Sequence, residues 1–124
     1  QRNPTRRRSS IVSEVVKVLE RAKELLNEKG WCQGELAKGA HGEAVDLLDP
    51  NAAAFCLVGA IRCQRETTSM DARLSAAIHL ANVVGRLRED WLTVPDYNDA
   101  PGRTKEEIME VIAKAIELAK GADE

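Results

Sequence analysis

The stretch LDPNAAAFCLVGAIRC, residues 48–63, decides how the chain folds. Asp49 is a good helix N-cap, and Pro50 suits the first helical position, where its missing N–H costs nothing. Small residues recur at every fourth position from Ala52 to Ala60, so they share one helix face. Because a face of small residues lets another backbone approach closely, we expect a central, buried helix that begins after Asp49.

Amphipathic helices are predicted on both sides of this stretch. Residues 9–29 repeat apolar side chains at spacings of three and four, and Gly30 ends the pattern. The same spacing predicts helices over residues 69–90 and 104–121. The side chains expected to face inward from the helix over 69–90 are Leu74, Ile78, Ala81, Val84 and Leu87.

The composition also favours helices, because aromatic residues make up 3% of the chain and the core must be built from smaller aliphatic side chains. Residues 31–48 lose the helical spacing and contain three glycines, which indicates an irregular segment or a small β-hairpin. We therefore expect a mostly α fold with four helices, orthogonal or bundle-like, and a small insertion around residues 31–48.

Charge is distributed unevenly along the chain. Residues 1–10 carry four arginines and no acid, whereas the whole chain has a net charge of −2. Such an arm contacts nucleic-acid phosphates in some proteins and is a frayed terminus in others. We expect residues 1–8 to be a disordered basic arm and residues 9–121 to form a single helical domain, with accessory nucleic-acid binding as an alternative function.

Cysteine usage and hydropathy indicate the compartment and the absence of cofactors. Three cysteines without a CxxC pair favour a reducing cytoplasm over a disulfide framework. No run approaches the roughly 20 apolar residues of a membrane span, so no membrane association is expected. Zinc ligands usually come in close pairs, which the cysteines and histidines do not form, so neither a metal nor another cofactor is expected.

A catalytic interpretation depends on Cys32 and His79. A thiolate nucleophile with an imidazole base, oriented by Asp99 or Asn98, would support a small hydrolase or transferase. The chemistry requires Cys32 and His79 to lie within hydrogen-bonding reach, and no catalytic motif surrounds Cys32. Enzymatic activity is therefore the alternative, and a role without catalysis is favoured.

The densest polar chemistry lies in DYNDAPGRTKEE, residues 96–107. The Pro101-Gly102 pair suits a type II turn, and Thr104 with Glu107 forms a capping box for the helix that follows. These features explain most of the segment structurally. Arg103 has two interpretations: it pairs with Asp99 and pins the loop, or it helps to receive an anionic ligand.

A polar stripe on the helix over 69–90 has two interpretations as well. Ser75, His79, Asn82 and Arg86 follow helical spacing, and they form either a solvated face or one wall of a pocket closed by the loop Trp91–Arg103. The candidate ligand-binding residues are therefore His79, Asn82, Arg86, Tyr97, Asn98, Asp99 and Arg103. The segment Trp31–Glu35 is a further candidate part of this surface.

Three blocks of the sequence resemble a known family. GWCQG (30–34), LDPNAAAFCLVGAI (48–61) and YNDAPGRTKEE (97–107) resemble a family of small bacterial and phage proteins classified as a domain of unknown function. The resemblance covers most of Gly30–Leu118 and implies a bacterial or phage origin. It brings no activity or site with it.

These observations together predict a small, soluble, helical binding or interaction domain. Its partner would be another protein or a small polar ligand. The sequence does not determine the oligomeric state.

Overall fold

The computed structural model of the protein describes residues 4–87 and 93–121, with side chains from residue 11 onward. This part of the chain contains five helices and one two-stranded sheet: α1 (Pro4–Glu28), β1 (Ala37–Lys38), β2 (Ala54–Phe55), α2 (Leu57–Arg62), α3 (Met70–Gly85), α4 (Val94–Asp99) and α5 (Lys105–Gly121). The mostly helical prediction is confirmed. The described helices number five where four were expected, because residues 94–99 of the predicted irregular connection form α4.

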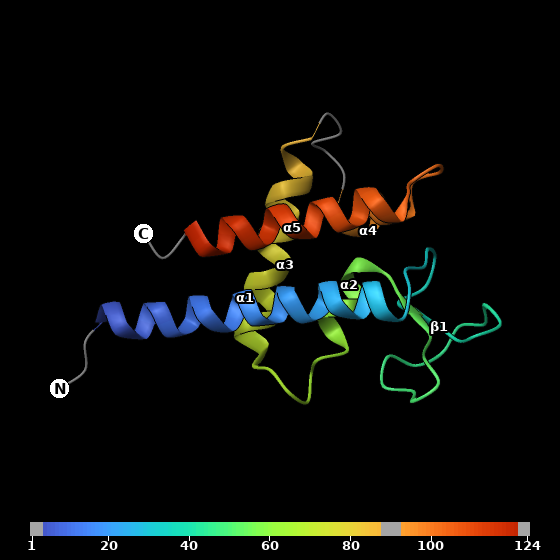
Figure 1. Cartoon of the computed structure of the whole chain (residues 1–124), viewed down its shortest axis with the longest axis horizontal. Helices are drawn as coiled ribbons and strands as arrows, with labels where there is room; N and C mark the ends of the chain where they lie inside the picture. Colours follow the sequence, from blue (N-terminus) through green and yellow to red (C-terminus); the bar gives the residue numbers. More distant parts are fainter. Residues whose placement is uncertain (1–3, 88–92, 122–124) are drawn as a thin grey trace.

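The long helices α1 and α5 lie side by side in opposite directions, and α3 crosses behind both of them (Figure 1). Short α2 and the two-stranded sheet lie near the C-terminal end of α1 (Figure 1). A single cluster of buried apolar side chains joins these helices. Its largest fully buried members are Leu19, Leu26, Leu57, Leu80, Ile108 and Ile112.

The spacing patterns of α1 and α5 place these two helices correctly. Of the apolar side chains that follow this spacing in α1, Val15, Val18 and Ala22 are buried, whereas Ile11 at the start of the pattern is 49% exposed. Gly30 ends the segment with a positive φ of 145°. In α5 the predicted inward positions are buried as well. Helix α1 begins at Pro4 rather than at residue 9, so its backbone includes most of the segment predicted as an arm. Among the described helices, none has both the length and the apolar character needed to cross a membrane.

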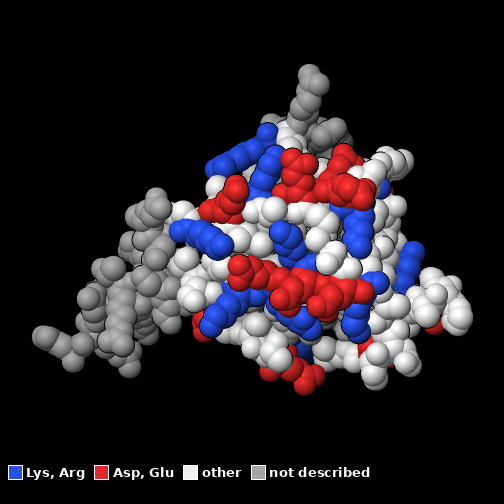
Figure 2. Space-filling view, in the orientation of Figure 1, with Lys and Arg blue, Asp and Glu red and all other residues white. Residues whose placement is uncertain are grey.

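The outer face that α1 and α5 form carries acidic and basic side chains next to one another (Figure 2). Ion pairs connect them within each helix, as between Arg21 and Glu24 at 2.9 Å. Lys120 of α5 also reaches Glu20 of α1 at 3.8 Å. This surface is an ordinary solvated face in which charges of both signs are mixed.

The predicted start of the second helix is wrong. Asp49 accepts a hydrogen bond from the backbone N–H of Asn51 at 2.8 Å, and the residues that follow are extended up to Cys56. Cys56 is the N-cap of α2, because its Sγ accepts a hydrogen bond from the N–H of Gly59 at 3.2 Å. The chain therefore keeps residues 54–55 for β2, which pairs antiparallel with β1. The hairpin expected within residues 31–48 is present in part, because Lys38 and Ala44 form an antiparallel bridge.

Helix α2 does bring another backbone close, but at Gly59, because residues 52–56 of the expected small-residue face are not helical. A Cβ atom at Gly59 would lie 2.9 Å from the carbonyl carbon of Leu36 and would overlap the carbonyl oxygen. The same carbonyl accepts a hydrogen bond from the N–H of Cys56 at 3.2 Å. Glycine at position 59 thus allows the segment before β1 to lie directly on α2.

The predicted inward face of α3 is largely wrong. Leu74 and Ile78 are 56% and 59% exposed, whereas Ala72 and Ala76 are buried. Helix α3 packs against both α1 and α5, and alanines at these positions allow it to approach them closely. Val84 is buried as expected. The end of the predicted helix, residues 88–90, lies outside the described residues together with Trp91.

The close approach at Gly59 predicts that Gly59→Ala destabilises the fold. The added methyl group must displace the Leu36 backbone, which we expect to lower the free energy of unfolding by about 2 kcal/mol. Gly85→Ala is the matched control, because a Cβ there meets no atom within 4 Å. It should leave stability unchanged or raise it by about 0.5 kcal/mol. Urea unfolding of both variants measures the difference, and equal stabilities would contradict the close approach.

Candidate functional site

The side chain of Asn98 joins three segments of the chain and is 1% exposed. Its Oδ1 accepts hydrogen bonds from Trp31 Nε1 at 2.7 Å and from the backbone N–H of Leu57 at 3.0 Å. Its Nδ2 donates to the carbonyl oxygen of Cys32 at 3.1 Å and to Asp99 Oδ1 at 2.9 Å. All four hydrogen-bonding positions of the amide are therefore occupied within the protein.

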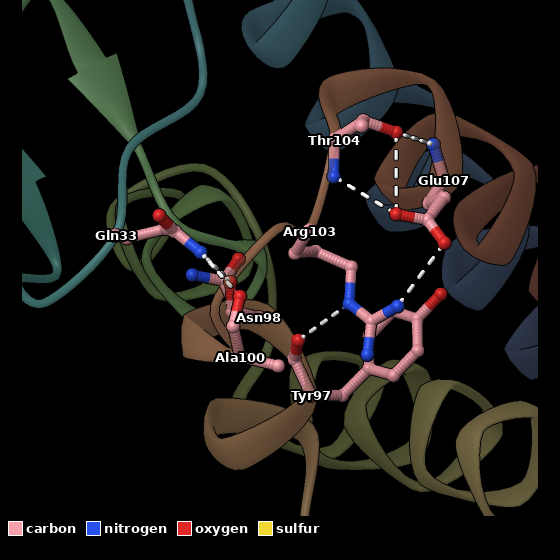
Figure 3. A network of polar contacts seen from close by, with 7 residues as sticks. All are labelled: Gln33, Tyr97, Asn98, Ala100, Arg103, Thr104 and Glu107. Carbon is pink, nitrogen blue, oxygen red and sulfur yellow. Dashed lines mark hydrogen bonds and ion pairs between the residues drawn. The ribbon is translucent and has the colours of Figure 1, made fainter.

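Further bonds strengthen the link between α4 and the segment after α1. Gln33 Nε2 donates to the carbonyl oxygens of Asn98 and Ala100, both at 3.0 Å (Figure 3). The backbone N–H of Gly34 donates to Asp99 Oδ1 at 2.9 Å. The structure thus brings the candidate segment Trp31–Glu35 together with Asn98 and Asp99. Among the described residues, no buried side-chain nitrogen or oxygen lacks a hydrogen-bond partner.

Arg103 forms a different tie from the one predicted. Its Nε donates to the carbonyl oxygen of Tyr97 at 2.9 Å, and its guanidinium lies 3.6 Å from the centre of the Tyr97 ring (Figure 3). The ion pair that the structure shows for Arg103 is with Glu107 at 3.2 Å, whereas Asp99 bonds to Gly34 and Asn98. Hence Arg103 pins the loop through Tyr97 and Glu107 rather than through Asp99.

The turn and cap predicted for this segment are confirmed. Gly102 has a φ of 81°, and the N–H of Arg103 donates to the carbonyl of Ala100 across the turn. Thr104 and Glu107 exchange side-chain to backbone hydrogen bonds of 2.9 and 3.2 Å, as a capping box requires. The bonds from Thr104 and the neighbouring Arg103 lower the pKa of the Glu107 carboxyl.

The polar residues of α3 do not join this network. His79 is half-buried, and its Nδ1 lies 2.7 Å from the carbonyl oxygen of Ser75 one turn earlier. Asn82 is exposed, and Arg86 lines a separate hollow with Lys114 and Glu117 of α5. A hollow next to Tyr97 and Arg103 is lined instead by the apolar Val83 of α3 and by Leu87 just beyond its end.

The geometry places Asp99 beside the segment of Cys32 but, in the described residues, pairs neither side chain with His79. Cys32 Sγ lies 3.5 Å from the carbonyl oxygen of Glu35, and in the described residues no hydrogen bond connects Cys32, His79 and Asp99. Burial, with the neighbouring Cys56 second, raises the pKa of the Cys32 thiol to about 11. At neutral pH roughly one thiol in ten thousand is then ionised, so Cys32 is a poor nucleophile.

Metal binding has no support from the described residues either. Within residues 4–87 and 93–121, no group of three or more His, Cys, Asp or Glu side chains is placed to hold an ion. The thiols of Cys56 and Cys63 also have a raised pKa because they are buried.

The candidate binding site is an apolar groove of about 610 Å³ between α2, α3 and α4. None of the individually predicted site residues lines it, but Val94 and Pro95 belong to the loop Trp91–Arg103 that the sequence predicts as part of a pocket. Its inner wall consists of buried Ile61, Leu80 and Val94. Met70 and Leu74 form its outer edge and are 64% and 56% exposed. These two large apolar side chains are thus mostly exposed to water at the edge of an apolar surface.

Three arginines, Arg62, Arg65 and Arg73, also line the apolar groove, whereas no aspartate or glutamate does. The Arg73 Nη1 donates to the carbonyl oxygen of Thr68 at 2.6 Å, so this side chain is held in place. Arg62 and Arg65 are exposed, and neither guanidinium has an ion-pair partner in the described part of the chain. The apolar groove is therefore bordered by positive charge.

The sequence contains a signal for this groove, but the signal is indirect. Leucine and isoleucine at helical spacing in α3 predict a core face, and an exposed apolar stripe has the same spacing. The alanines at positions 72 and 76 are the sign that a second face of α3 is the packed one. Two apolar faces on one helix indicate that one of them is left for a partner.

The comparisons with known proteins give one match. A sequence model described as Family of unknown function (DUF6197) matches residues 11–118. No curated protein and no solved structure matches the chain significantly. The match is consistent with the resemblance predicted from the three sequence blocks, and the bacterial or phage origin stays a prediction.

The network around Asn98 predicts that Asn98→Leu strongly destabilises the protein. The substitution leaves the donors of Trp31 and Leu57 and the acceptor of Cys32 without partners, which we expect to cost roughly 3 kcal/mol or more. Asn82→Leu, at an exposed position on α3, should change stability by less than about 0.5 kcal/mol. Urea unfolding compares the two variants, and a small loss for Asn98→Leu would show that the network is not essential.

The raised pKa of Cys32 predicts slow alkylation in the folded protein. At neutral pH the rate with iodoacetamide should be about a hundredfold below that of the urea-unfolded chain, since the pKa rises from 9.0 to about 11. The folded rate should then increase with pH up to about pH 11. Peptide mass spectrometry separates Cys32 from the other two thiols. Equal rates in the folded and unfolded states would contradict the raised pKa, and a faster rate in the folded protein would indicate an activated thiol and support the catalytic alternative.

Proposed function

The chain belongs to a family of unknown function, and we propose that it is a binding domain. Its binding site is the apolar groove between α2, α3 and α4. The ligand or partner that fits this groove combines an apolar surface with negative charge. The single observation that supports the proposal is the presence of exposed Met70 and Leu74 beside exposed Arg62 and Arg65, which form no ion pair with any described residue.

The exposure of apolar side chains carries a cost in water that a binding role explains. Single exposed leucines are common on protein surfaces, but adjoining ones that border a groove are typical of interaction sites. Here the exposed edge continues directly into the buried wall of Ile61 and Leu80. An apolar group in the groove would therefore contact both the edge and the wall.

The arginines add selectivity to this apolar contact. A guanidinium group forms paired hydrogen bonds with a carboxylate or a sulfonate, and these bonds fix the orientation of a bound group. Arg62 and Arg65 are exposed and lie at the groove without an acidic neighbour among its lining residues. An amphipathic anion thus gains from both parts of the site.

The hydrogen-bond network around Asn98 has a structural role and does not form a second binding site. Asn98 and Asp99 use their side chains for internal hydrogen bonds, and Arg103 is 14% exposed in its ion pair with Glu107. A polar ligand would first have to break these bonds. The apolar groove requires no such rearrangement.

Binding of 1-anilinonaphthalene-8-sulfonate, an aromatic anion, tests the proposal. We expect the native protein to bind the dye and Leu74→Glu to bind it about tenfold more weakly, because the substitution removes roughly 1.4 kcal/mol of apolar contact and repels the sulfonate. Fluorescence titration at neutral pH measures the affinity. Since Leu74 is 56% exposed, the variant should unfold at the same urea concentration as the native protein.

Ile78→Glu is the matched control, because Ile78 is also on α3 and 59% exposed but does not line the groove. It should bind the dye like the native protein. If Leu74→Glu and Ile78→Glu bind the dye as well as the native protein does, the apolar groove is not the site.

A further inference from the structure

We propose that the occupant of the apolar groove is an acidic amphipathic helix of a partner protein. The inference rests on the proposed function and goes further, because it names the class of ligand. It depends on the length of the exposed apolar surface, on the sign of the charges beside it and on the absence of acids among the groove-lining residues.

The exposed apolar surface is longer than the groove. Met70, Leu74 and Ile78 are spaced four residues apart on α3 and are all more than half exposed. Two helical turns separate the first from the third, a rise of roughly 12 Å. Met70 and Leu74 lie at the groove, and Ile78 continues the stripe beyond it. An elongated partner covers this whole stripe, whereas a compact ligand in the groove leaves Ile78 in water.

The openness of the site also favours a macromolecule. A small-molecule pocket usually encloses most of its ligand. Here the edge residues Met70 and Leu74 are themselves largely in solvent, so they cannot enclose a small ligand. A helix that lies along a groove needs contact on one face only, and its apolar residues at spacings of three and four match those of α3.

The charged side chains at the groove indicate which charge the partner carries. Arg62, Arg65 and Arg73 lie along the groove, and no acid is among its lining residues. The face that α1 and α5 form differs from the groove, because basic side chains lie beside acidic ones there and form ion pairs with them (Figure 2). The excess of positive charge at the groove therefore attracts acidic residues that flank an apolar stripe.

A second copy of the chain is a poor occupant. A two-fold symmetric contact places the same patch of both copies face to face. The three arginines of one groove would then meet those of the other, without an acid of the groove lining to neutralise them. Repulsion between like charges at close range opposes such a dimer.

Selection from a displayed library of random peptides, each about 16 residues or roughly 24 Å of helix, tests the inference. The native protein is the bait, and Leu74→Glu is the counter-selection bait. We expect the enriched peptides to carry net negative charge and apolar residues at spacings of three and four. Their affinity should fall about tenfold for Ile78→Glu, which does not line the groove.

Charge reversal provides the second arm of the experiment. Arg62→Glu should lower the affinity for the enriched peptides about tenfold. Lys23→Glu, on the α1 and α5 side, should leave this affinity unchanged. Enriched peptides without negative charge, or with the same affinity for Arg62→Glu, would overturn the inference. Enrichment of no peptide over the counter-selection bait would overturn it too.

The outcomes separate this inference from the function on which it rests. If Leu74→Glu loses dye binding but no acidic peptide is selected, the groove is a binding site and the helical partner is ruled out. The ligand would then be a small amphipathic anion. Dye binding that is the same in the native protein and in Leu74→Glu would remove the groove itself as a site. A dimer in light scattering that dissociates in Leu74→Glu would assign the groove to a second copy.

Discussion

The fold depends on the amide of Asn98, which is buried and ties α4 by hydrogen bonds to two other segments of the chain. It holds the indole of Trp31, the first N–H of α2 at Leu57 and the carbonyl of Cys32. A buried amide is costly unless every group is paired, so these bonds specify one arrangement of α2, α4 and the segment after α1. The position of α4 against α2 in turn forms the wall of the apolar groove at Val94 and Ile61.

Small side chains set the second constraint. Gly59 admits the backbone of Leu36, and Ala72 and Ala76 let α3 cross α1 and α5 closely. The core face of α3 consists of these alanines together with Leu80, Val83 and Val84. Leu74 and its neighbours on the other face are thereby left for the surface.

Local patterns predicted the local structure well, and the failures arose where distant segments meet. The pattern of α1, the turn at Gly102 and the capping box of Thr104 are properties of neighbouring residues, and all are confirmed. Asp49 looked like a helix cap, but pairing of residues 54–55 with β1 moves the start of α2 to Leu57. The groove escaped prediction because exposed and buried leucines of a helix have the same spacing, and packing of α3 decides between them.

The central claim is that binding occurs at the apolar groove and that the Asn98 network only supports it. The most direct test is a nitrogen-15 chemical-shift titration of the native protein with an aromatic sulfonate. Binding at the groove predicts shifts of the backbone amides around Ile61, Met70 and Leu74, with the Trp31 indole and Asn98 side-chain signals unchanged. Shifts that gather at Trp31 and Asn98 and spare the groove would contradict it.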